Sequence, residues 1–329
     1  MNYKPNLLLS LLLMLAFGLA ACAPASAPEA AASFPTGALN VMAPASPGGG
    51  WDGTARAMQP ILAKTSGQTV QVYNVSGAGG TVGLAQFVSE AKGNPHELMV
   101  GGLVMVGAIQ TNKSPVNLSQ VTPLALLTAE AEAIAVPADS KYENLQQLID
   151  DFKADPTAIS WGGGSAGGTD HILVGLIAKE VGVDPAQINY IAHSGGGEAT
   201  AAILSGAVSA GVSGVSEFAD QVESGAMRLL AVSSEERVEG VDAPTIKEAG
   251  VDVALINWRA VFGPPDLTPE ERDAVVAEIQ EMHDSAEWQQ ALEANGWSDF
   301  FKPGDEFATF LNEEITRIEG VLKDIGLVQ

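Results

Sequence analysis

The chain has one cysteine, Cys22, among its 329 residues, so no internal disulfide can form and stability must come from a large core. Basic residues are also scarce: 16 lysines and arginines oppose 40 aspartates and glutamates, a net charge of −24. This charge disfavours nucleic acid and anionic membrane surfaces as partners. No metal or other cofactor is expected, because the four histidines lack ligand spacing. They are His96, His171, His193 and His283.

The one long apolar run lies at residues 7–20, between Lys4 and the sequence LAAC that ends at Cys22. About 14 residues are too few to cross a hydrocarbon core, which needs about 20. The pattern predicts a lipoprotein signal peptide over residues 1–21, with the lipid on Cys22. An ordinary signal peptide is the alternative. Residues 22–35 hold few bulky apolar residues and predict a disordered tether, so we expect a bacterial extracytoplasmic protein anchored to a membrane.

Beyond the tether, short strand-like segments alternate with helical patterns, which is typical of a parallel α/β sheet. Roughly 300 residues exceed one usual core, so we expect two lobes, residues 36–132 with 255–329 and residues 133–254. Four strands are each followed by a helix, at 39–43 and 51–64, 70–75 and 81–92, 158–163 and 170–181, and 189–193 and 198–204. Further strands are expected at 98–103, 133–136, 208–212 and 229–232, and helices at 270–283, 288–294 and 305–322.

Four glycine-rich loops join these strands to their helices: SPGGGWD (46–52), SGAGGTVG (76–83), WGGGSAGGTD (161–170) and HSGGGE (193–198). Ligands of open α/β sheets bind at such junctions. Glycine lets backbone N–H groups approach a ligand, and the start of a helix adds partial positive charge. Four such loops predict one anion-binding site, although any single loop could be a tight turn that only needs a positive φ.

Five segments, in order from residue 39, carry a family resemblance: APASPGGGWD, NVSGAGGTVG, HSGGGEATAAILSGAVSAGVSG, RLLAVSSEERVEGVDAPTIKEAGVDV and NWRAVFGPP. They resemble the solute-binding receptors of tripartite tricarboxylate transporters, the Bug family, and within it the tricarboxylate-receptor branch. The resemblance implies a two-lobed periplasmic-binding-protein fold of the flytrap type, each lobe a mostly parallel sheet flanked by helices. It further implies a receptor without enzymatic activity. The receptor would capture a carboxylate in the cleft, citrate being the first guess, and deliver it to a large many-span permease subunit and a small membrane subunit.

The resemblance also implies ligand contacts from both lobes. In the first lobe they are Ser46, Pro47, Gly48, Gly49, Gly50, Trp51, Ala78, Gly79, Gly80 and Thr81. In the second they are Ser165, Thr169, Gly195, Gly196, Gly197, Ser213 and Ser216. An acidic residue in this set of loops, Asp170, must cap its helix or pair with a cation to lie near an anionic ligand.

The chemistry of three side chains, Arg259, Arg56 and Trp51, indicates roles of their own. Arg259 has a planar guanidinium suited to a carboxylate, with a structural pairing to an acid at the hinge as the alternative. Arg56 lies one helical turn after Asp52 and is expected to pair with it. Trp51 is expected as an apolar wall of the cleft or as a core residue over the first helix.

Several other functions are compatible with parts of the sequence. Residues 163–167 fit G-x-S-x-G, which would make Ser165 an esterase nucleophile, but nothing frames a histidine as its base. A dinucleotide site at residues 77–83 lacks the last glycine of its motif, since Val82 stands there. The ligand could instead be a dicarboxylate, nicotinate, an aromatic acid or a metal–citrate complex. The same fold could also serve as a ligand-presenting signalling component.

Overall fold

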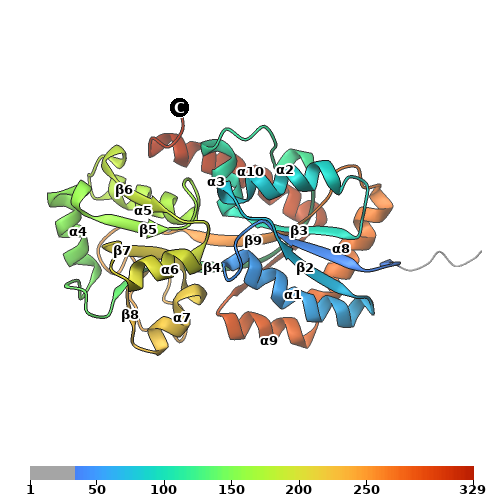
Figure 1. Ribbon diagram of the computed structural model, residues 1–329, viewed down its shortest axis with the longest axis horizontal. Helices are drawn as coiled ribbons and strands as arrows, with labels where there is room; N and C mark the ends of the chain where they lie inside the picture. The colour runs from blue at the N-terminus through green and yellow to red at the C-terminus, as the bar shows by residue number, and fades with distance from the viewer. Residues whose placement is uncertain (1–33) are drawn as a thin grey trace, which may run out of the picture. The chain divides into compact units, whose positions relative to one another are not determined.

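The computed structural model describes residues 34–329, which form one compact unit (Figure 1). The predicted signal peptide, Cys22 and most of the predicted tether lie outside the described residues. Phe34 packs on His96 with ring centroids 5.3 Å apart, and the Gln68 amide donates to the Pro35 carbonyl over 3.3 Å. The ordered body therefore includes the last two residues assigned to the tether. Within the described residues, no helix is long and apolar enough to cross a membrane.

The described chain alternates strands and helices. The strands are β1 (Leu39–Ala43), β2 (Val70–Asn74), β3 (Glu97–Gly102), β4 (Thr122–Pro137), β5 (Ser160–Gly163), β6 (Asn189–Ala192), β7 (Ala210–Gly214), β8 (Met227–Val232), β9 (Ile256–Gly263) and β10 (Ser298–Pro303). The α-helices are α1 (Gly50–Ser66), α2 (Thr81–Glu90), α3 (Leu103–Thr111), α4 (Leu145–Ala154), α5 (Thr169–Glu180), α6 (Gly196–Leu204), α7 (Val215–Glu223), α8 (Pro269–His283), α9 (Ala286–Asn295) and α10 (Gly304–Asp324).

One strand, β4, belongs to both halves of the sheet. The strand order is β2-β1-β3-β9-β4-β7-β5-β6, and β8 and β10 also pair with β4. The first part of β4 pairs with β9 and β10, and the second part with β7 and β8. We call the β1, β2, β3, β9, β10 side lobe 1 and the β5, β6, β7, β8 side lobe 2; β4 and β9 run between them in Figure 1.

Each lobe keeps a parallel core, and the antiparallel pairs among the described strands all involve β4 or β9. In lobe 1, β1 pairs in parallel with β2 and β3; in lobe 2, β5 pairs in parallel with β6 and β7. Because the carboxyl ends of parallel strands meet at one edge, this arrangement brings the glycine loops of each lobe together. The two lobes present these edges to each other.

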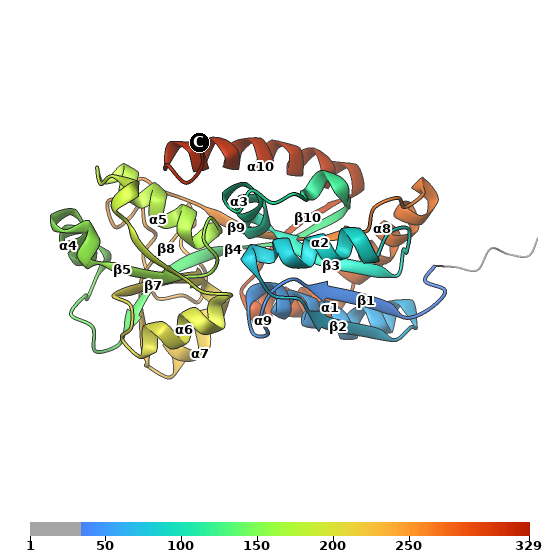
Figure 2. The ribbon, with the colours of Figure 1, turned by 45° about the horizontal axis from the view of Figure 1, so that its top comes forward.

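Helix α10 reaches from one lobe to the other. Its buried residues include Phe307, Leu311 and Ile318, a stripe at helical spacing, and Figure 2 shows it lying over α3 and β10. At its end, Asp324 pairs with Lys179 of α5 over 2.8 Å. Ile325 packs against Gly175 of the same helix, α5. The C-terminal segment thus contacts lobe 2 although most of α10 covers lobe 1.

The four strand–helix pairs predicted from the sequence are present, with boundaries shifted by a few residues. The prediction was incomplete elsewhere: it placed a strand only at residues 133–136, whereas β4 covers 16 residues, and it missed α3, α4, α7, β9 and β10. Helix α3 (LVMVGAIQT) is apolar on nearly all sides and short, so it has no periodicity to distinguish it from a buried strand.

Candidate functional site

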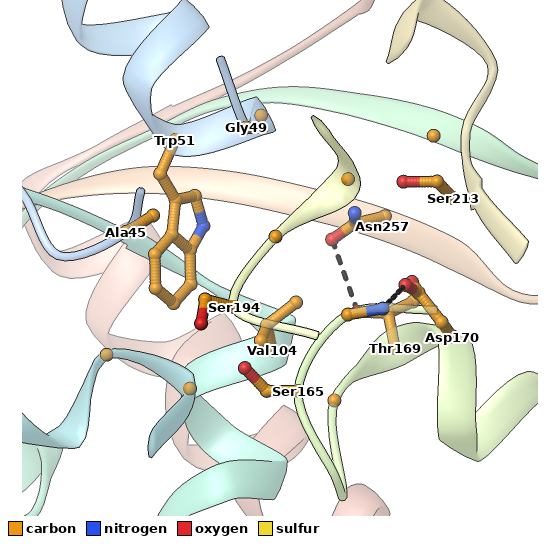
Figure 3. A pocket seen from close by; sticks show the side chains of 18 of the residues that line it. Ala45, Gly49, Trp51, Val104, Ser165, Thr169, Asp170, Ser194, Ser213 and Asn257 are labelled. Carbon is orange, nitrogen blue, oxygen red and sulfur yellow. Dashed lines mark hydrogen bonds between the residues drawn. The ribbon is translucent and has the colours of Figure 1, made fainter. Parts of the chain in front are cut away.

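A cavity lies between the lobes, where the glycine loops face one another. Figure 3 shows Trp51 and Ala45 at one end of it with Ser194 beside them, Val104 and Ser165 in the middle, and Asn257, Ser213 and Asp170 toward the other end. The lining residues are Pro44, Ala45, Gly49, Gly50, Trp51, Gly77, Ala78, Gly79, Gly80, Val104, Gly164, Ser165, Gly168, Thr169, Asp170, Ser194, Gly195, Gly196, Ser213, Gly214, Glu217, Asn257 and Arg259. The cavity therefore has an apolar end and a polar end.

Most residues predicted to contact the ligand line this cavity. The predicted residues in the lining are Gly49, Gly50, Trp51, Ala78, Gly79, Gly80, Ser165, Thr169, Gly195, Gly196, Ser213 and Arg259. The predicted residues outside the lining are Ser46, Pro47, Gly48, Thr81, Gly197 and Ser216. The lining residues that the prediction left out of its ligand contacts include Ala45, Val104, Ser194, Glu217 and Asn257.

Three of the four glycine loops are fastened by an acid in the first turn of the helix that follows, whereas the loop before α2 has no such acid. Gly48 N–H donates to Asp52 over 2.9 Å, Gly164 N–H to Asp170 over 2.6 Å and Ser194 N–H to Glu198 over 3.0 Å. In the β7–α7 loop, the Ser213 hydroxyl donates to Glu217 over 3.0 Å. Asp170 thus fastens the loop before α5. It is not the expected helix cap, because the N-cap of α5 is Gly168 and has no side-chain hydrogen bond. The N–H groups bonded to these carboxylates are not free to bind a ligand.

Asp52 is the most fully bonded of these acids. Besides Gly48 N–H, it accepts from Arg56 Nε and from the Asn74 amide, each over 2.9 Å, which confirms the predicted pairing with Arg56. Burial alone would raise the pKa of Asp52, but these three hydrogen bonds lower it below its ordinary value. The loop before α1 is consequently held by an ionised carboxylate.

The second loop of lobe 1 depends on backbone conformations that favour glycine. Gly79 and Gly80 have φ values of 62° and 87°, and Ala78 is held at φ 47°. A Cβ at Gly80 would lie 2.6 Å from the Trp51 ring, so the indole packs directly on this backbone. Trp51 is 6% exposed and lines the cavity, so it serves as both the apolar wall and the core residue considered above.

Strand β9 places two polar side chains at the polar end because side chains alternate along a strand. Asn257 and Arg259 line the cavity, and Asn257 accepts a hydrogen bond from Thr169 over 3.4 Å. Trp258 between them points to the other side, where its indole N–H donates to Glu314 over 2.9 Å. The NWR segment thus supplies both the cavity and the packing beneath α10.

Arg259 is buried and paired, which was the structural alternative for this residue. Its Nη2 forms an ion pair with Glu130 and lies 3.9 Å from Glu217. Glu130 also accepts from the Ser216 hydroxyl over 2.7 Å, which explains why Ser216 lies behind the cavity lining. Nη1 of Arg259 has no hydrogen-bond partner among residues 34–329. The Nη2 atom of the guanidinium is therefore used in a structural ion pair, whereas the Nη1 atom has no hydrogen bond among the described residues.

Four acids accompany this single guanidinium: Glu130, Glu132, Asp170 and Glu217. Burial raises the pKa of Glu217 to about 7, against the opposing effect of Arg259. Burial likewise raises the pKa of Asp170 to about 6, while the Gly164 N–H lowers it. Burial and the charges of the other three acids raise the pKa of fully buried Glu132 well above its ordinary value. Part of the cluster is thus protonated near neutral pH.

The arrangement around Ser165 does not resemble a catalytic triad. Nδ1 of His171 accepts from Gly167 N–H over 3.1 Å, and burial lowers the pKa of His171 to about 4. Nδ1 of His193 lies 3.0 Å from the Gly163 carbonyl. Between residues 34 and 329, no histidine bonds to the Ser165 hydroxyl, and no group of three or more Asp, Glu, His or Cys could hold a metal ion.

Two α/β lobes joined by a shared strand, with helix starts from both facing one cavity, define a solute-binding protein of the periplasmic type. A model of the tripartite tricarboxylate transporter family receptor matches residues 54–327. The chain therefore belongs to this receptor family.

Individual relatives agree with this assignment. The chain is 27% identical to protein BugT of Bordetella pertussis over 307 residues, covering 92% of this chain and 93% of BugT. The structure of the periplasmic binding protein BugD has a TM-score of 0.82 at 21% identity, covering 90% of this chain and 99% of BugD. MatC from Rhodopseudomonas palustris with bound malate has a TM-score of 0.79 at 25% identity, covering 88% of this chain and 100% of MatC. The predicted fold is confirmed, and the comparisons do not distinguish the citrate branch.

Proposed function

We propose that this protein captures a di- or tricarboxylate outside the cytoplasm and delivers it to the membrane subunits of a tripartite transporter, without enzymatic activity. The observation that carries the proposal is the cavity closed by the starts of α1 and α6, from opposite lobes, in a chain of this receptor family. Backbone N–H groups at helix starts attract a carboxylate. The malate bound to MatC supports the same ligand class.

Citrate is the first ligand to test, and the family's membrane subunits are the proposed partners. We also propose lipid attachment at Cys22, since the LAAC sequence supports it. We further propose that the lobes move about the two strands that connect them, β4 and β9. The predicted contacts that line the cavity are the proposed ligand-binding residues.

The test is the melting temperature of the purified protein with a panel of acids, with and without Mg²⁺. The panel contains citrate, isocitrate, tricarballylate, succinate, malate, aspartate, glutamate, nicotinate and aromatic acids. A ligand at about 100 times its Kd stabilises by about 2.7 kcal/mol, which shifts the melt by several degrees. We expect a shift with citrate-like acids that does not require Mg²⁺. Absence of a shift with every acid would contradict the proposed function.

A further inference from the structure

The polar end of the cavity holds an acceptor and a donor that are both incompletely paired. Oε1 of Glu217 lies 3.9 Å from Nη2 of Arg259 and makes no hydrogen bond with the described residues. Nη1 of Arg259 has no hydrogen-bond partner within residues 34–329 and is itself buried, and the guanidinium packs over the Trp297 ring at 5.4 Å from its centroid. Arg259 also lines the cavity. Because a charged group is costly to bury with few partners, a ligand that pairs with Glu217 and with the cavity-facing part of this guanidinium gains from each contact.

Both groups are held firmly in place. Glu217 is bonded to Ser213, and a Cβ at Gly196 would overlap its Oε2. A Cβ at Gly50 would lie 2.9 Å from Oε1 of Glu217, so the carboxyl group sits between the first turns of α1 and α6. Arg259 is fixed by its ion pair with Glu130. The acceptor and the donor therefore form a rigid pair that belongs to both lobes.

The charge of this end disfavours a ligand that presents only carboxylates. Glu217 and Asp170 line it, and the guanidinium is already shared with Glu130. Near neutral pH Glu217 is only partly ionised, because burial raises its pKa to about 7. In its ionised form, which a higher pH favours, a second ligand carboxylate placed against it would meet repulsion, whereas a hydrogen-bond donor there would be stabilised. The opposite end, with Trp51 and Ala45, offers apolar contact.

We propose that Glu217 and Arg259 select an acid that carries a hydroxyl or ammonium group on the carbon next to a carboxylate. The carboxylate accepts from Arg259, and the neighbouring hydroxyl or ammonium group donates to Glu217. This inference rests on the proposed carboxylate binding. It adds that the ligand must contain a carboxylate with a hydroxyl or ammonium group on the adjacent carbon. Citrate contains that unit at its central carbon, whereas tricarballylate has the same three carboxylates without the hydroxyl group.

The test compares ligands that differ only in this group, with Kd measured by calorimetry. For the wild type we expect citrate to bind at least about tenfold more tightly than tricarballylate, or malate or aspartate to exceed succinate by the same factor. Malate and aspartate distinguish a hydroxyl from an ammonium donor. In Glu217→Leu, which removes the acceptor, the ratio of the two Kd values in each pair should fall close to one. Glu217→Gln, which keeps an acceptor oxygen without the charge, should retain part of the preference.

The matched control is Glu223→Gln at the exposed end of the same helix, α7, which also removes one negative charge. It should keep the wild-type preference. Equal binding of both members in every pair, or a preference unchanged in Glu217→Leu and Glu217→Gln, would overturn this inference and leave the receptor function intact. If no acid binds the wild type at all, the proposed function fails instead. If Glu217→Leu does not fold, Glu217→Gln alone tests the inference. The ratio of Kd values within a ligand pair must then fall at least about threefold for the inference to stand.

Discussion

The side chain of Glu217 is 13% exposed and shares its surroundings with Glu130, Glu132 and Asp170. Burial and mutual repulsion in such a grouping favour the protonated forms of the acids. The pKa of Glu217 is about 7 and that of Asp170 about 6, both above the ordinary values of these side chains. A buried acid with a raised pKa contributes stability below its unfolded pKa and loses it as pH rises through the folded pKa.

This relation predicts how Glu217 changes the pH dependence of folding. Without ligand, the free energy of unfolding should fall between about pH 4.5 and pH 8, and Glu217→Gln should remove up to roughly 3 kcal/mol of that fall. Denaturant unfolding at several pH values measures it. Glu223→Gln should keep the wild-type slope. A Glu217→Gln slope equal to that of the wild type would show that this carboxyl group titrates normally.

Glu217 also shows what the sequence did not reveal at the residue scale. The glycine loops were predictable because strand, glycines and helix follow one another along the chain. The role of Glu217 was not, because its contacts with Gly50 and Arg259 join residues distant in sequence. One available signal was overlooked: the loops at 46–52, 161–170, 193–198 and 213–217 each end in an acid in the first helical turn. That pattern predicts loop caps.

At the scale of elements, helix α3 and the loop between β5 and α5 meet across the lobes. A Cβ on Gly107 of α3 would overlap the carbonyl oxygen of Gly167, which is backbone and cannot rotate away. Gly167 itself has a φ of 75°. The two segments can therefore approach this closely only while residue 107 lacks a side chain.

Gly107→Ala should consequently prevent full closure of the lobes. We expect the ligand to bind at least about tenfold more weakly. A strain of only about 1.4 kcal/mol in the closed form is enough to raise the Kd tenfold. Calorimetry with the best acid of the panel measures this loss. Gly53→Ala, at an exposed position of helix α1 with open space around the new methyl group, should bind normally and gain about 0.5–1 kcal/mol of stability. Wild-type affinity in Gly107→Ala would contradict closure through this contact.

The elements that the sequence predicted well have clear periodicity or turn residues at their ends. Among the missed elements, helix α3 lacks periodicity, whereas α4 is amphipathic and begins at an Asn cap but was still overlooked. Strand β4 is buried along most of its 16 residues. Its middle, TAEAEA, does alternate, but alanine and glutamate favour helices over strands, so the composition hides the strand. Helix α7, by contrast, is amphipathic but short, and the glycine before it resembles an ordinary turn. The secondary structure of such segments depends on how they are buried in the folded protein, and the local sequence pattern does not contain that information.

At the scale of the whole molecule, the net charge of −24 opposes the approach of an anionic ligand. Only short-range donors at the helix starts favour binding. Salt screens the long-range repulsion more than these close contacts. Raising the ionic strength from about 0.01 to 0.2 M should therefore increase the association rate a few-fold, as stopped-flow fluorescence would show. A marked decrease would mean that a positive field guides the ligand.

The continuity of β4 determines how the two lobes can move. No loop separates the part of β4 in lobe 1 from the part in lobe 2, and its register shifts near Pro123, Leu126 and Ile134. Separation of the lobes must be absorbed as torsion of the β4–β9 ribbon, spread over many backbone dihedrals, with the bulges as its most compliant points. The restoring torque of that ribbon, rather than a freely swinging joint, then sets how far the empty receptor opens.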